Sequence, residues 1–401
     1  IIIFSMKTSH DDTLLIHSGR APAHFGGMVN TPPCRASTLL VDSYADWKAA
    51  RADANPYGHY ARFGTATTRS FEALLAELEG AYDAQVFPSG LAACTHAMLA
   101  FLSPGDHILI TDNVYGPTRA FADQVLSKMG VQVEYFCPLE GASIAKRFRS
   151  TTRVLYLESP GSQTFEVVDV PALAQVAHAF GAWVLMDNTW ATPLYFKPFQ
   201  HGVDVSIHAA TKYLVGHSDA ILGAVTTNQR AWPRLQAHAQ AFGQTAGPDD
   251  IYMATRGLRT LSVRLQRHQA TALMLAERLQ AHPAVEAVLH PALSSSPGHA
   301  LWKRDFLGAS GLFGVVLQPV PAGAQALEKF FDQLTLFGIG LSWGGYESLA
   351  LPIDTPSRSV TSWPYQGPLL RLHAGLEDPE TLWADLANAL SVYCDMKALA
   401  L

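Results

Sequence analysis

Five short runs of apolar residues, each ending in polar residues, constrain the fold of this chain more than any other feature of its sequence. They are HILITDN (107–113), VLYLESP (154–160), WVLMDNT (183–189), VDVSIHA (203–209) and ILGAVTT (221–227). Continuous apolar runs of this length are typical of strands that are buried on both faces of a sheet. Because helical patterns alternate with them, we expect an α/β fold with a largely parallel sheet, whose reactive groups collect beyond the C-terminal ends of the strands.

Helical periodicity and changes in composition predict three parts. The segment 1–62 is rich in Pro, Gly, Ser and Thr and is predicted to be an N-terminal arm. Residues 63–255 hold the apolar runs and two helical patterns, TATTRSFEALLAELEG, which ends at Gly80, and DVPALAQVAHAFG, which begins at a capping Asp169. Residues 256–401 are predicted to form a smaller α/β domain with the helices SVRLQRHQATALMLAERLQAH and DPETLWADLANALSVY.

Charge and cysteine content narrow the class of protein. A formal net charge of -6 and a pI near 6.2 give no reason to expect nucleic acid or an anionic membrane as a partner. No apolar run reaches the ~18 residues that would span a bilayer. The opening IIIFSMKTSHDD lacks a basic region, a long hydrophobic stretch and a cleavage site, so we expect no secretory signal; Met6 is one candidate for the natural start. Four scattered cysteines favour a reduced, cytoplasmic protein with buried thiols and no metal site.

A single lysine, Lys212, stands among small residues after the run that ends at Ala209. A lysine at a strand end is ordinarily a solvated surface charge. Here the preceding Ala209, Ala210 and Thr211 are too small to shield it, and Asp187 ends a neighbouring apolar run. An amine and a carboxylate at adjacent strand ends form either an ion pair or the two grips on a pyridoxal ring, the aspartate on the ring nitrogen and the lysine on the aldehyde carbon.

A turn before a helical pattern supplies a candidate phosphate site. In FPSGLAAC, Ser89, Gly90 and Leu91 precede the run LAACTHAMLAFL, and glycine allows backbone amides at a helix start to face an anion. Many helices begin with Ser-Gly, so the motif alone is weak. The hydroxyl of Thr211, next to Lys212, adds a second donor and makes a phosphate cup a specific prediction.

Seven motifs together resemble the Cys/Met-metabolism family of pyridoxal-phosphate enzymes, and within it the bacterial β-lyase branch. They are YARFGT, FPSGLAA, LESPGS, MDNTWA, SIHAATKYLVGHSDAILG, SWGGYESL and LLRLHAGLED, in the family's order, and the resemblance covers residues 10 to 395. It implies the aspartate-aminotransferase-like fold (fold type I), with an arm, a large cofactor domain and a small C-terminal domain. It also implies pyridoxal 5'-phosphate as cofactor and a homo-oligomer, a dimer with shared active sites that assembles further into a tetramer.

The resemblance assigns roles to individual residues. Lys212 would bond covalently to the cofactor, Asp187 would pair with the ring nitrogen, and Tyr115 in NVYGPT would stack on the ring; these three are the expected catalytic residues. Arg371 in LLRLHAG would grip the substrate carboxylate, although a structural ion pair is the alternative. The phosphate would be held by Gly90, Leu91 and Thr211 with Tyr60 and Arg62 from a neighbouring subunit, and the substrate also by Ser342 and Trp343.

Departures from the wider family bear on specificity. Many relatives carry serine at the position of Ala209 and Thr-Asn-Pro after ESP, where this chain has Gly161 and Ser162. Both differences agree with the β-lyase branch, as does Trp343, where γ-acting relatives tend to have leucine. Leu341 disagrees, because a tyrosine is expected there, and this puts the distal substrate contacts in question.

The implied reaction is α,β-elimination of L-cystathionine to homocysteine, pyruvate and ammonia. A cysteine or cystine desulfhydrase or a γ-lyase would use the same cofactor machinery with other substrate contacts. A non-catalytic regulator that keeps the fold is a further alternative, which the joint presence of Lys212, Asp187 and Arg371 disfavours. GASGLFG (308–314) lacks the spacing of a dinucleotide-binding loop, and the histidines, such as His208 and His217, show no metal-ligand spacing.

Overall fold

The computed structural model describes residues 10–52, 60–354 and 356–398, and the candidate start at Met6 lies outside them. The central sheet has the strands β1 (Asp83–Phe87), β2 (His107–Thr111), β3 (Gln132–Phe136), β4 (Thr152–Glu158), β5 (Trp183–Asp187), β6 (Val205–His208) and β7 (Gly223–Thr227). Their order across the sheet is β1-β7-β6-β5-β4-β2-β3. Pairing is parallel from β3 through β2, β4 and β5 to β6, whereas β7 is antiparallel to both β6 and β1. The predicted, mostly parallel sheet is confirmed.

Both faces of this sheet are buried, as its continuous apolar strands predict. Ile108 and Ile110 of β2 belong to the buried cluster that includes residues of α4 (Gly90–Leu99) and α8 (Trp232–Ala241). Leu109 of the same strand belongs to the cluster on the other face, with residues of α6 (Val170–Ala179). Burial of each such side chain contributes roughly 1.5–3 kcal/mol, so the two helical layers fix the strands firmly. The strand ends are thereby fixed as well.

The helices that cover the sheet begin and end where local sequence signals place them. In α3 (Ala66–Glu79), Gly80 has a φ of 75° and closes the helix, as predicted. In α6 the side chain of Asp169 accepts a hydrogen bond from Ala172 N, also as predicted. The remaining elements around the large sheet are α5 (Gly116–Phe121), η3 (Ala122–Leu126), η4 (Gly141–Arg147), α7 (Thr192–Tyr195), η5 (Pro198–His201) and α9 (Pro248–Leu258).

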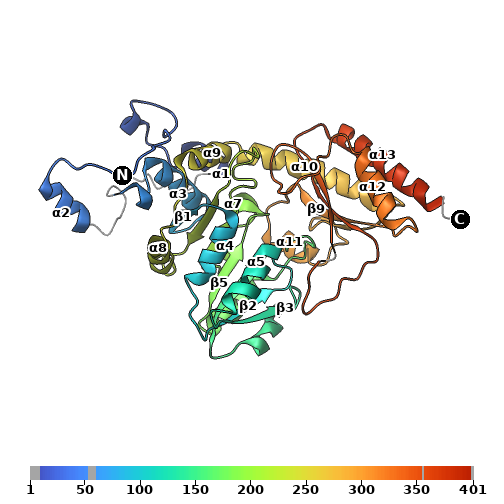
Figure 1. Cartoon of the computed structure of the whole chain (residues 1–401), viewed down its shortest axis with the longest axis horizontal. Helices are drawn as coiled ribbons and strands as arrows, with labels where there is room; N and C mark the ends of the chain where they lie inside the picture. The colour runs from blue at the N-terminus through green and yellow to red at the C-terminus, as the bar shows by residue number, and fades with distance from the viewer. Residues whose placement is uncertain (1–9, 53–59, 355, 399–401) are drawn as a thin grey trace.

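A second sheet, antiparallel throughout, lies beside the large one (Figure 1). Its strands are β8 (Val285–Leu289), β9 (Leu312–Leu317), β10 (Leu349–Ile353) and β11 (Leu369–His373), in the order β10-β11-β9-β8. The helices α10 (Leu261–Gln280), α12 (Gly323–Gln333) and α13 (Pro379–Ala398) pack on it, and α11 (His299–Asp305) precedes β9. The run GASGLFG therefore leads into β9 of this small sheet.

The two sheets share a hydrophobic core. Leu312, Val316 and Leu369 of the small sheet belong to the same buried cluster as Met186 of the large sheet. The indole of Trp190 also donates a hydrogen bond to Leu312 O over 2.9 Å. This shared core fixes the position of the small sheet relative to the strand ends of the large one. The domain boundaries at residues 62 and 255 remain predictions.

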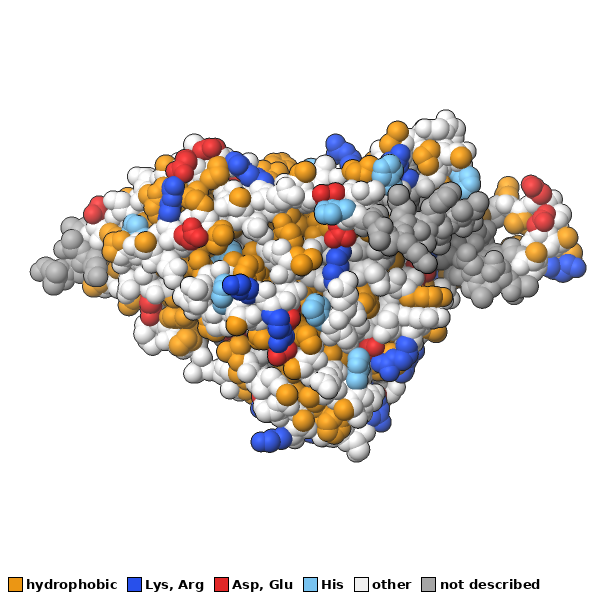
Figure 2. Space-filling model, turned by 180° about the vertical axis from the view of Figure 1, so that it is seen from behind, with side chains coloured by type: hydrophobic (Ala, Val, Ile, Leu, Met, Phe, Trp, Pro, Cys, Tyr) orange, Lys and Arg blue, Asp and Glu red, His pale blue; other side chains and the backbone are white. Residues whose placement is uncertain are grey.

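The N-terminal segment contains more helix than its composition predicts. It holds α1 (Asp11–His17), η1 (Pro22–Phe25), α2 (Tyr44–Ala52) and η2 (Ala61–Phe63), and α2 extends away from the sheets (Figure 1). Large hydrophobic side chains are exposed on it, with Leu40 at 92% and Tyr44 at 74%. On the opposite face of the molecule, shown in Figure 2, hydrophobic side chains lie interspersed with charged ones over the central body. Similarly exposed apolar side chains occur outside the arm, among them Leu341 at 87% and Leu307 at 71%.

The structure bears on two expectations, the burial of the four cysteines and the lack of a membrane span. Only Cys94 is buried, while Cys34, Cys137 and Cys394 are partly exposed, so the expectation of four buried thiols was wrong for three of them. The reason is that Cys34 and Cys137 lie outside the helices and strands, and Cys394 of α13 lies at the margin of the core of the small sheet, against which it packs. Among the described residues, we find no helix that is long and apolar enough to cross a membrane.

Candidate active site

Lys212 lies four residues beyond β6, at the C-terminal edge of the large sheet, as predicted. Its Nζ donates a hydrogen bond to Ser342 Oγ over 2.6 Å and lies 5.5 Å from the centre of the Trp343 ring. Burial, together with the charge of Arg371, lowers the pKa of the Lys212 amine to about 8, and Asp187 opposes this shift. The amine is therefore far easier to deprotonate near neutral pH than a surface lysine.

Asp187 ends the adjacent strand β5, and its carboxylate is held by two groups. Oδ1 accepts a hydrogen bond from Thr189 N over 2.9 Å, and the thiol of Cys94 donates to Oδ2 over 3.6 Å. Burial and the charge of Asp187 raise the pKa of the Cys94 thiol well above its usual value, so the thiol keeps the proton that it donates. The sequence did not predict Cys94, because α4 meets β5 only in the folded chain.

A second carboxylate, Glu158, lies opposite Asp187 in the pairing of β4 with β5. Its Oε2 accepts a hydrogen bond from Tyr115 N over 2.7 Å. Burial and the proximity of Asp187 raise the pKa of Glu158 well above its usual value. Burial first, then the charges of Cys94, Glu158 and Asp187, raise the pKa of the Tyr115 hydroxyl, while Arg371 lowers it. The Tyr115 hydroxyl is therefore close enough to the strand-end carboxylates and to Arg371 to interact with their charges. Glu158 is a residue that sequence analysis quoted, in LESPGS, without giving it a role.

A turn that precedes β10 brings Ser342 and Trp343 to Lys212. Ser342 has a φ of 79°, unusual for a residue with a side chain, and its carbonyl accepts a hydrogen bond from Arg371 Nη2 over 2.9 Å. At Gly344, with a φ of 88°, an added Cβ would lie 2.8 Å from Tyr213 N and 3.1 Å from Lys212 Cα. Only glycine allows this approach, so the turn is pressed against the lysine.

His373 holds the same turn from β11. Its Nε2 lies 3.2 Å from Gly344 N and 3.1 Å from Gly345 O. Burial, followed by the neighbouring His268, lowers the pKa of His373 to about 3, so the ring is neutral at working pH. Sequence analysis did not predict this residue, although it lies in the quoted LLRLHAGLED, two positions after Arg371 and on the same face of the strand.

The N-terminus of α4 approaches the strand end that precedes Lys212. The hydroxyl of Ser89 caps the helix by accepting from Ala92 N over 3.1 Å. A Cβ on Gly90 would lie 2.4 Å from Ala209 Cβ, so glycine is required for this contact. Within the described parts of the chain, no hydrogen bond uses the N–H groups of Gly90 and Leu91. They are free donors at the positive end of a helix, as a phosphate requires.

Thr211 and the two arm residues lie in other surroundings. The hydroxyl of Thr211 donates to Leu222 O over 3.2 Å and accepts from Leu222 N over 3.0 Å. Arg62 donates to Gln240 O of α8 over 3.3 Å, and its guanidinium lies 5.8 Å from the centre of the exposed Tyr60 ring. Over residues 10–52, 60–354 and 356–398, no hydrogen bond or ion pair joins Tyr60 or Arg62 to Lys212, Asp187 or Arg371.

The assembled groups fit pyridoxal phosphate. The site offers a lysine with a depressed pKa, a buried carboxylate on the adjacent strand and free helix N–H groups. It also offers an aromatic ring at Tyr115 and a half-buried guanidinium at Arg371. These are the donors and acceptors that an aldehyde, a pyridine nitrogen, a phosphate, a ring face and a substrate carboxylate need.

Comparison with known proteins gives a consistent result. The sequence model of the Cys/Met metabolism PLP-dependent enzyme family matches residues 12–391. Cystathionine beta-lyase MetC of Escherichia coli (strain K12) is 45% identical over 383 residues, which are 94% of this chain and 96% of that protein. An L-alanine/L-glutamate racemase of Wolbachia pipientis wMel is 40% identical over 393 residues, 95% of this chain and 97% of that protein.

Solved structures agree with the sequence relatives. The crystal structure of metB from Corynebacterium glutamicum superposes with a TM-score of 0.87 and 30% sequence identity. The match covers 96% of this chain and 98% of that chain. The likeness therefore extends over both sheets and confirms the fold that the motifs implied.

Proposed function

The chain belongs to the Cys/Met metabolism family of PLP-dependent enzymes, and on that premise we propose that it is a cystathionine β-lyase. It cleaves L-cystathionine to homocysteine, pyruvate and ammonia. The observation that carries the proposal is the convergence of Lys212, Asp187 and Arg371 in a chain 45% identical to the cystathionine beta-lyase of Escherichia coli.

We assign the cofactor contacts from this geometry. Lys212 takes the aldehyde, Asp187 the ring nitrogen, and Tyr115 one face of the ring. The N–H groups of Gly90 and Leu91 bind the phosphate, with Thr211 beside them after its hydroxyl turns from Leu222. Pyridoxal phosphate, when bound, supplies a ring that withdraws electrons and stabilises negative charge at the substrate Cα. Asp187 keeps the ring nitrogen protonated, since a buried carboxylate favours a positive partner.

Arg371 orients the substrate. Its guanidinium is partly buried and donates a hydrogen bond to Ser342 O. This bond fixes the orientation of the guanidinium and therefore the directions of its remaining N–H groups. A carboxylate bound there is held in a plane by two parallel hydrogen bonds. The bond between Cα and its hydrogen then faces Lys212. Trp343, whose ring packs on Tyr213 at a centroid distance of 5.3 Å, forms an apolar wall beside the thioether.

Lys212 moves the proton. Once the substrate amine has taken its place on the aldehyde, Lys212 Nζ is a neutral amine that accepts the proton from Cα, and the resulting ammonium is held by Ser342 Oγ, its partner at 2.6 Å. When the bond between Cβ and sulfur breaks, sulfur leaves with the electron pair and Lys212 returns a proton to it, giving homocysteine. The remaining three-carbon fragment reacts with water to give pyruvate and ammonia. The pKa of about 8 suits a group that must both take and give a proton near neutral pH.

We further propose that the active enzyme is a cytoplasmic homo-oligomer. Two subunits share each active site, in that Tyr60 and Arg62 of one subunit complete the phosphate site of the other, and such dimers pair into a tetramer. Exposed apolar side chains on the arm, such as Leu40 and Tyr44, support this assembly because contact with a partner would bury them. Within one chain the phosphate is bound only by neutral donors, and Arg62 of the second subunit would add a positively charged donor.

One experiment separates the candidate reactions. Purified enzyme with pyridoxal phosphate is incubated with L-cystathionine, and all products are measured. A β-lyase yields pyruvate and homocysteine, whereas 2-oxobutyrate and cysteine as main products would show a γ-lyase and refute the proposal. Release of sulfide and pyruvate from cysteine, or of pyruvate and a persulfide from cystine, at a higher kcat/KM would show a desulfhydrase instead.

A second candidate is amino-acid racemisation, favoured by the 40% identity to the Wolbachia racemase. Removal of the Cα proton is common to both reactions, and racemisation requires its return from the opposite face. The same protein is therefore incubated with L-alanine and with L-glutamate, and the D-enantiomers are quantified. A kcat/KM for racemisation above that for cystathionine cleavage would make the racemase reading the correct one.

A further inference from the structure

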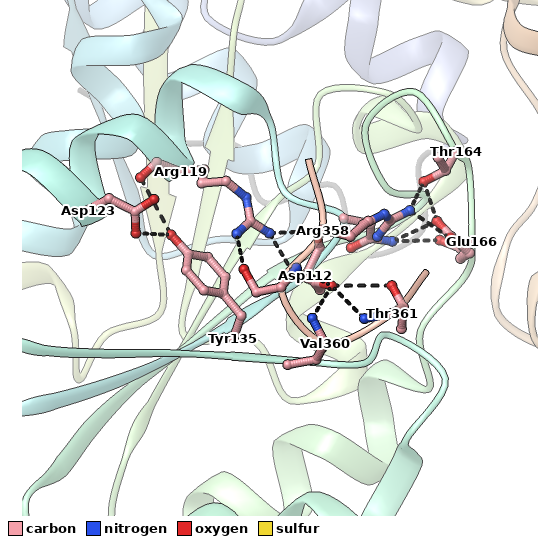
Figure 3. A network of polar contacts seen from close by, with 11 residues as sticks. Asp112, Arg119, Asp123, Tyr135, Thr164, Glu166, Arg358, Val360 and Thr361 are labelled. Carbon is pink, nitrogen blue, oxygen red and sulfur yellow. Dashed lines mark hydrogen bonds and ion pairs between the residues drawn. The ribbon is translucent and has the colours of Figure 1, made fainter. Parts of the chain in front are cut away.

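A buried carboxylate, Asp112, lies directly after β2 and accepts hydrogen bonds from the nearby Arg119 and from the distant residues 359–361 (Figure 3). Oδ1 accepts from Arg119 Nη2 over 2.6 Å and from Ser359 N over 2.9 Å. Oδ2 accepts from Val360 N over 3.0 Å and from the N and Oγ1 of Thr361, each over 3.2 Å. Three successive backbone N–H groups thus converge on one carboxylate, an arrangement that suits an anion.

Arg119 is fixed on every side. Its Nη2 donates a second time, to Asp112 O over 2.8 Å, and its Nη1 donates to Ser359 Oγ over 2.8 Å. The guanidinium lies 3.8 Å from the centre of the Tyr135 ring, whose hydroxyl donates to Asp123 Oδ1 over 2.7 Å. A side chain with so many partners transmits a displacement of one partner to the others.

A second anchor lies beside the first (Figure 3). Arg358 pairs with Glu166 over 2.7 Å, has a side chain only 6% exposed and also contacts Thr164 Oγ1. Glu166 accepts in turn from Asn113 Nδ2 over 3.3 Å. The clamp segment, Arg358–Thr361, is therefore bonded to the turns that follow β2 and β4, which are neighbouring strands of the large sheet.

Asp112, Arg119 and the clamp segment form a hydrogen-bonded hub, and the turn between Asp112 and Arg119 carries Tyr115. Asp112 lies three residues before Tyr115 and Arg119 four residues after it, and Arg119 N donates to Tyr115 O over 3.0 Å. A pocket of about 300 Å³ is lined by Asn113 and Gly116 of this turn and by Arg358 of the clamp segment. Because this space is not filled by side chains, hydrogen bonds rather than close packing hold the turn on that side.

We propose that Asp112 and Arg119, tied to the clamp segment, are positioning residues that fix the turn carrying Tyr115 and so hold its ring against the cofactor. The proposal rests on the role assigned to Tyr115 under the proposed function. Asp112 touches neither substrate nor cofactor and acts through Tyr115. Removal of its carboxylate would leave three backbone N–H groups without their acceptor and Arg119 without its ion-pair partner, and the turn would relax into the adjacent pocket.

A double-mutant cycle on cofactor affinity tests this. The holoenzyme and its variants Asp112→Ala, Tyr115→Ala and the double variant are dialysed against a series of pyridoxal phosphate concentrations, and bound cofactor is read from its absorption band. We expect Asp112→Ala to weaken binding about tenfold in the wild-type background and less than about twofold when Tyr115 is already alanine. Asp106→Ala, at the opposite end of β2, is the matched control, since Asp106 caps Ser103 N over 2.8 Å and has no link to Tyr115. Its affinity should equal that of the wild type.

A milder pair of variants covers the case in which Asp112→Ala fails to fold. Ser359→Ala with Thr361→Val removes two hydroxyl contacts of the hub and leaves the backbone bonds, and it should weaken binding about threefold, again only when Tyr115 is present. Equal losses in both backgrounds, or unchanged affinity for both hub variants, overturn the positioning role. Wild-type affinity in Tyr115→Ala alone would instead overturn the role of Tyr115, while the cystathionine assay tests the reaction separately.

Discussion

The strand ends of the large sheet and the N-terminal arm supply residues to one expected site, yet the chain holds them very differently. Asp187 and Lys212 follow adjacent strands, and both carry hydrogen bonds to buried or half-buried partners at 2.6 to 3.6 Å. Among the described residues, Arg62 has one hydrogen bond, 3.3 Å long, to a backbone carbonyl on α8, and the Tyr60 ring beside it is exposed. Contacts within one chain fix the side chains of Asp187 and Lys212. Contacts within one chain do not fix the side chains of Tyr60 and Arg62 to the same degree.

This difference shows which part of the site is organised before assembly. Residues fixed on a sheet keep their mutual geometry without a cofactor or a partner. Residues on a segment with exposed apolar side chains acquire theirs when another surface covers the segment. Mutations in the two groups should therefore differ in size of effect and in whether a second subunit can compensate for them.

The largest effect is expected at the strand ends. Lys212→Ala should lower kcat for cystathionine cleavage by about 10³-fold or more, because the group that moves the Cα proton is lost. The thermal midpoint and most of the cofactor binding should persist, since the sheet, Asp187 and the phosphate site remain. Activity within tenfold of the wild type would contradict the assignment, and circular dichroism of the variant serves as the folding control.

An intermediate effect is expected in the arm. Arg62→Ala should weaken cofactor binding or activity by roughly 10- to 150-fold, the equivalent of a lost charge-assisted bond of about 1.5–3 kcal/mol. The distinguishing measurement mixes this variant with Lys212→Ala after dissociation and reassembles the chains. One site of each hybrid dimer then carries both defects and the other carries neither, so activity should recover. If hybrids verified by mass stay as inactive as their parents, Arg62 acts within its own chain and the contrast between the regions disappears.

The smallest effect concerns pH. Because the pKa of Lys212 is lowered to about 8, the fraction of Lys212 that is a neutral amine increases as the pH rises through that value. Only the neutral amine reacts with an aldehyde, so the rate of cofactor uptake by the cofactor-free protein should rise about tenfold between pH 7 and pH 9 and then level off. A rate that keeps rising until the ordinary lysine value of 10.5 would show that the site does not depress the pKa before the cofactor enters. Uptake monitored by absorbance gives the curve directly.

Sequence reasoning worked best where chemistry follows a regular element. Asp187 and Lys212 were predicted because apolar runs end at a definite residue, and parallel strands bring such ends together. β3 was not among the predicted strands, since it pairs only with β2 at the sheet edge and most of its residues are partly exposed, which removes the continuous apolar signal. The helices α1 and α2 were likewise not predicted, because the Pro, Gly, Ser and Thr of the arm conceal short helical patterns.

Contacts made across the fold were beyond prediction. Cys94 meets Asp187 only because α4 packs on the sheet beside β5, and Asp112 meets Thr361 across 249 positions of sequence. Neither pairing leaves a periodic or spacing signal in the chain. Glu158 and His373 differ, in that both lie inside quoted motifs and next to assigned residues, so a rule that examines every polar residue at a strand end would have found them.

The turn at Lys212 also determines where the substrate range of this enzyme can be changed by directed evolution. Gly344 has no room for a side chain, and Ser342 has a strained backbone and binds the lysine, so a library that randomises these positions would consist mostly of inactive clones. Leu341 immediately precedes them and its side chain is 87% exposed, so replacing that side chain removes little packing from the turn. A library randomised at position 341 would be screened for cleavage of other thioethers. Every member of it would keep the catalytic turn unchanged.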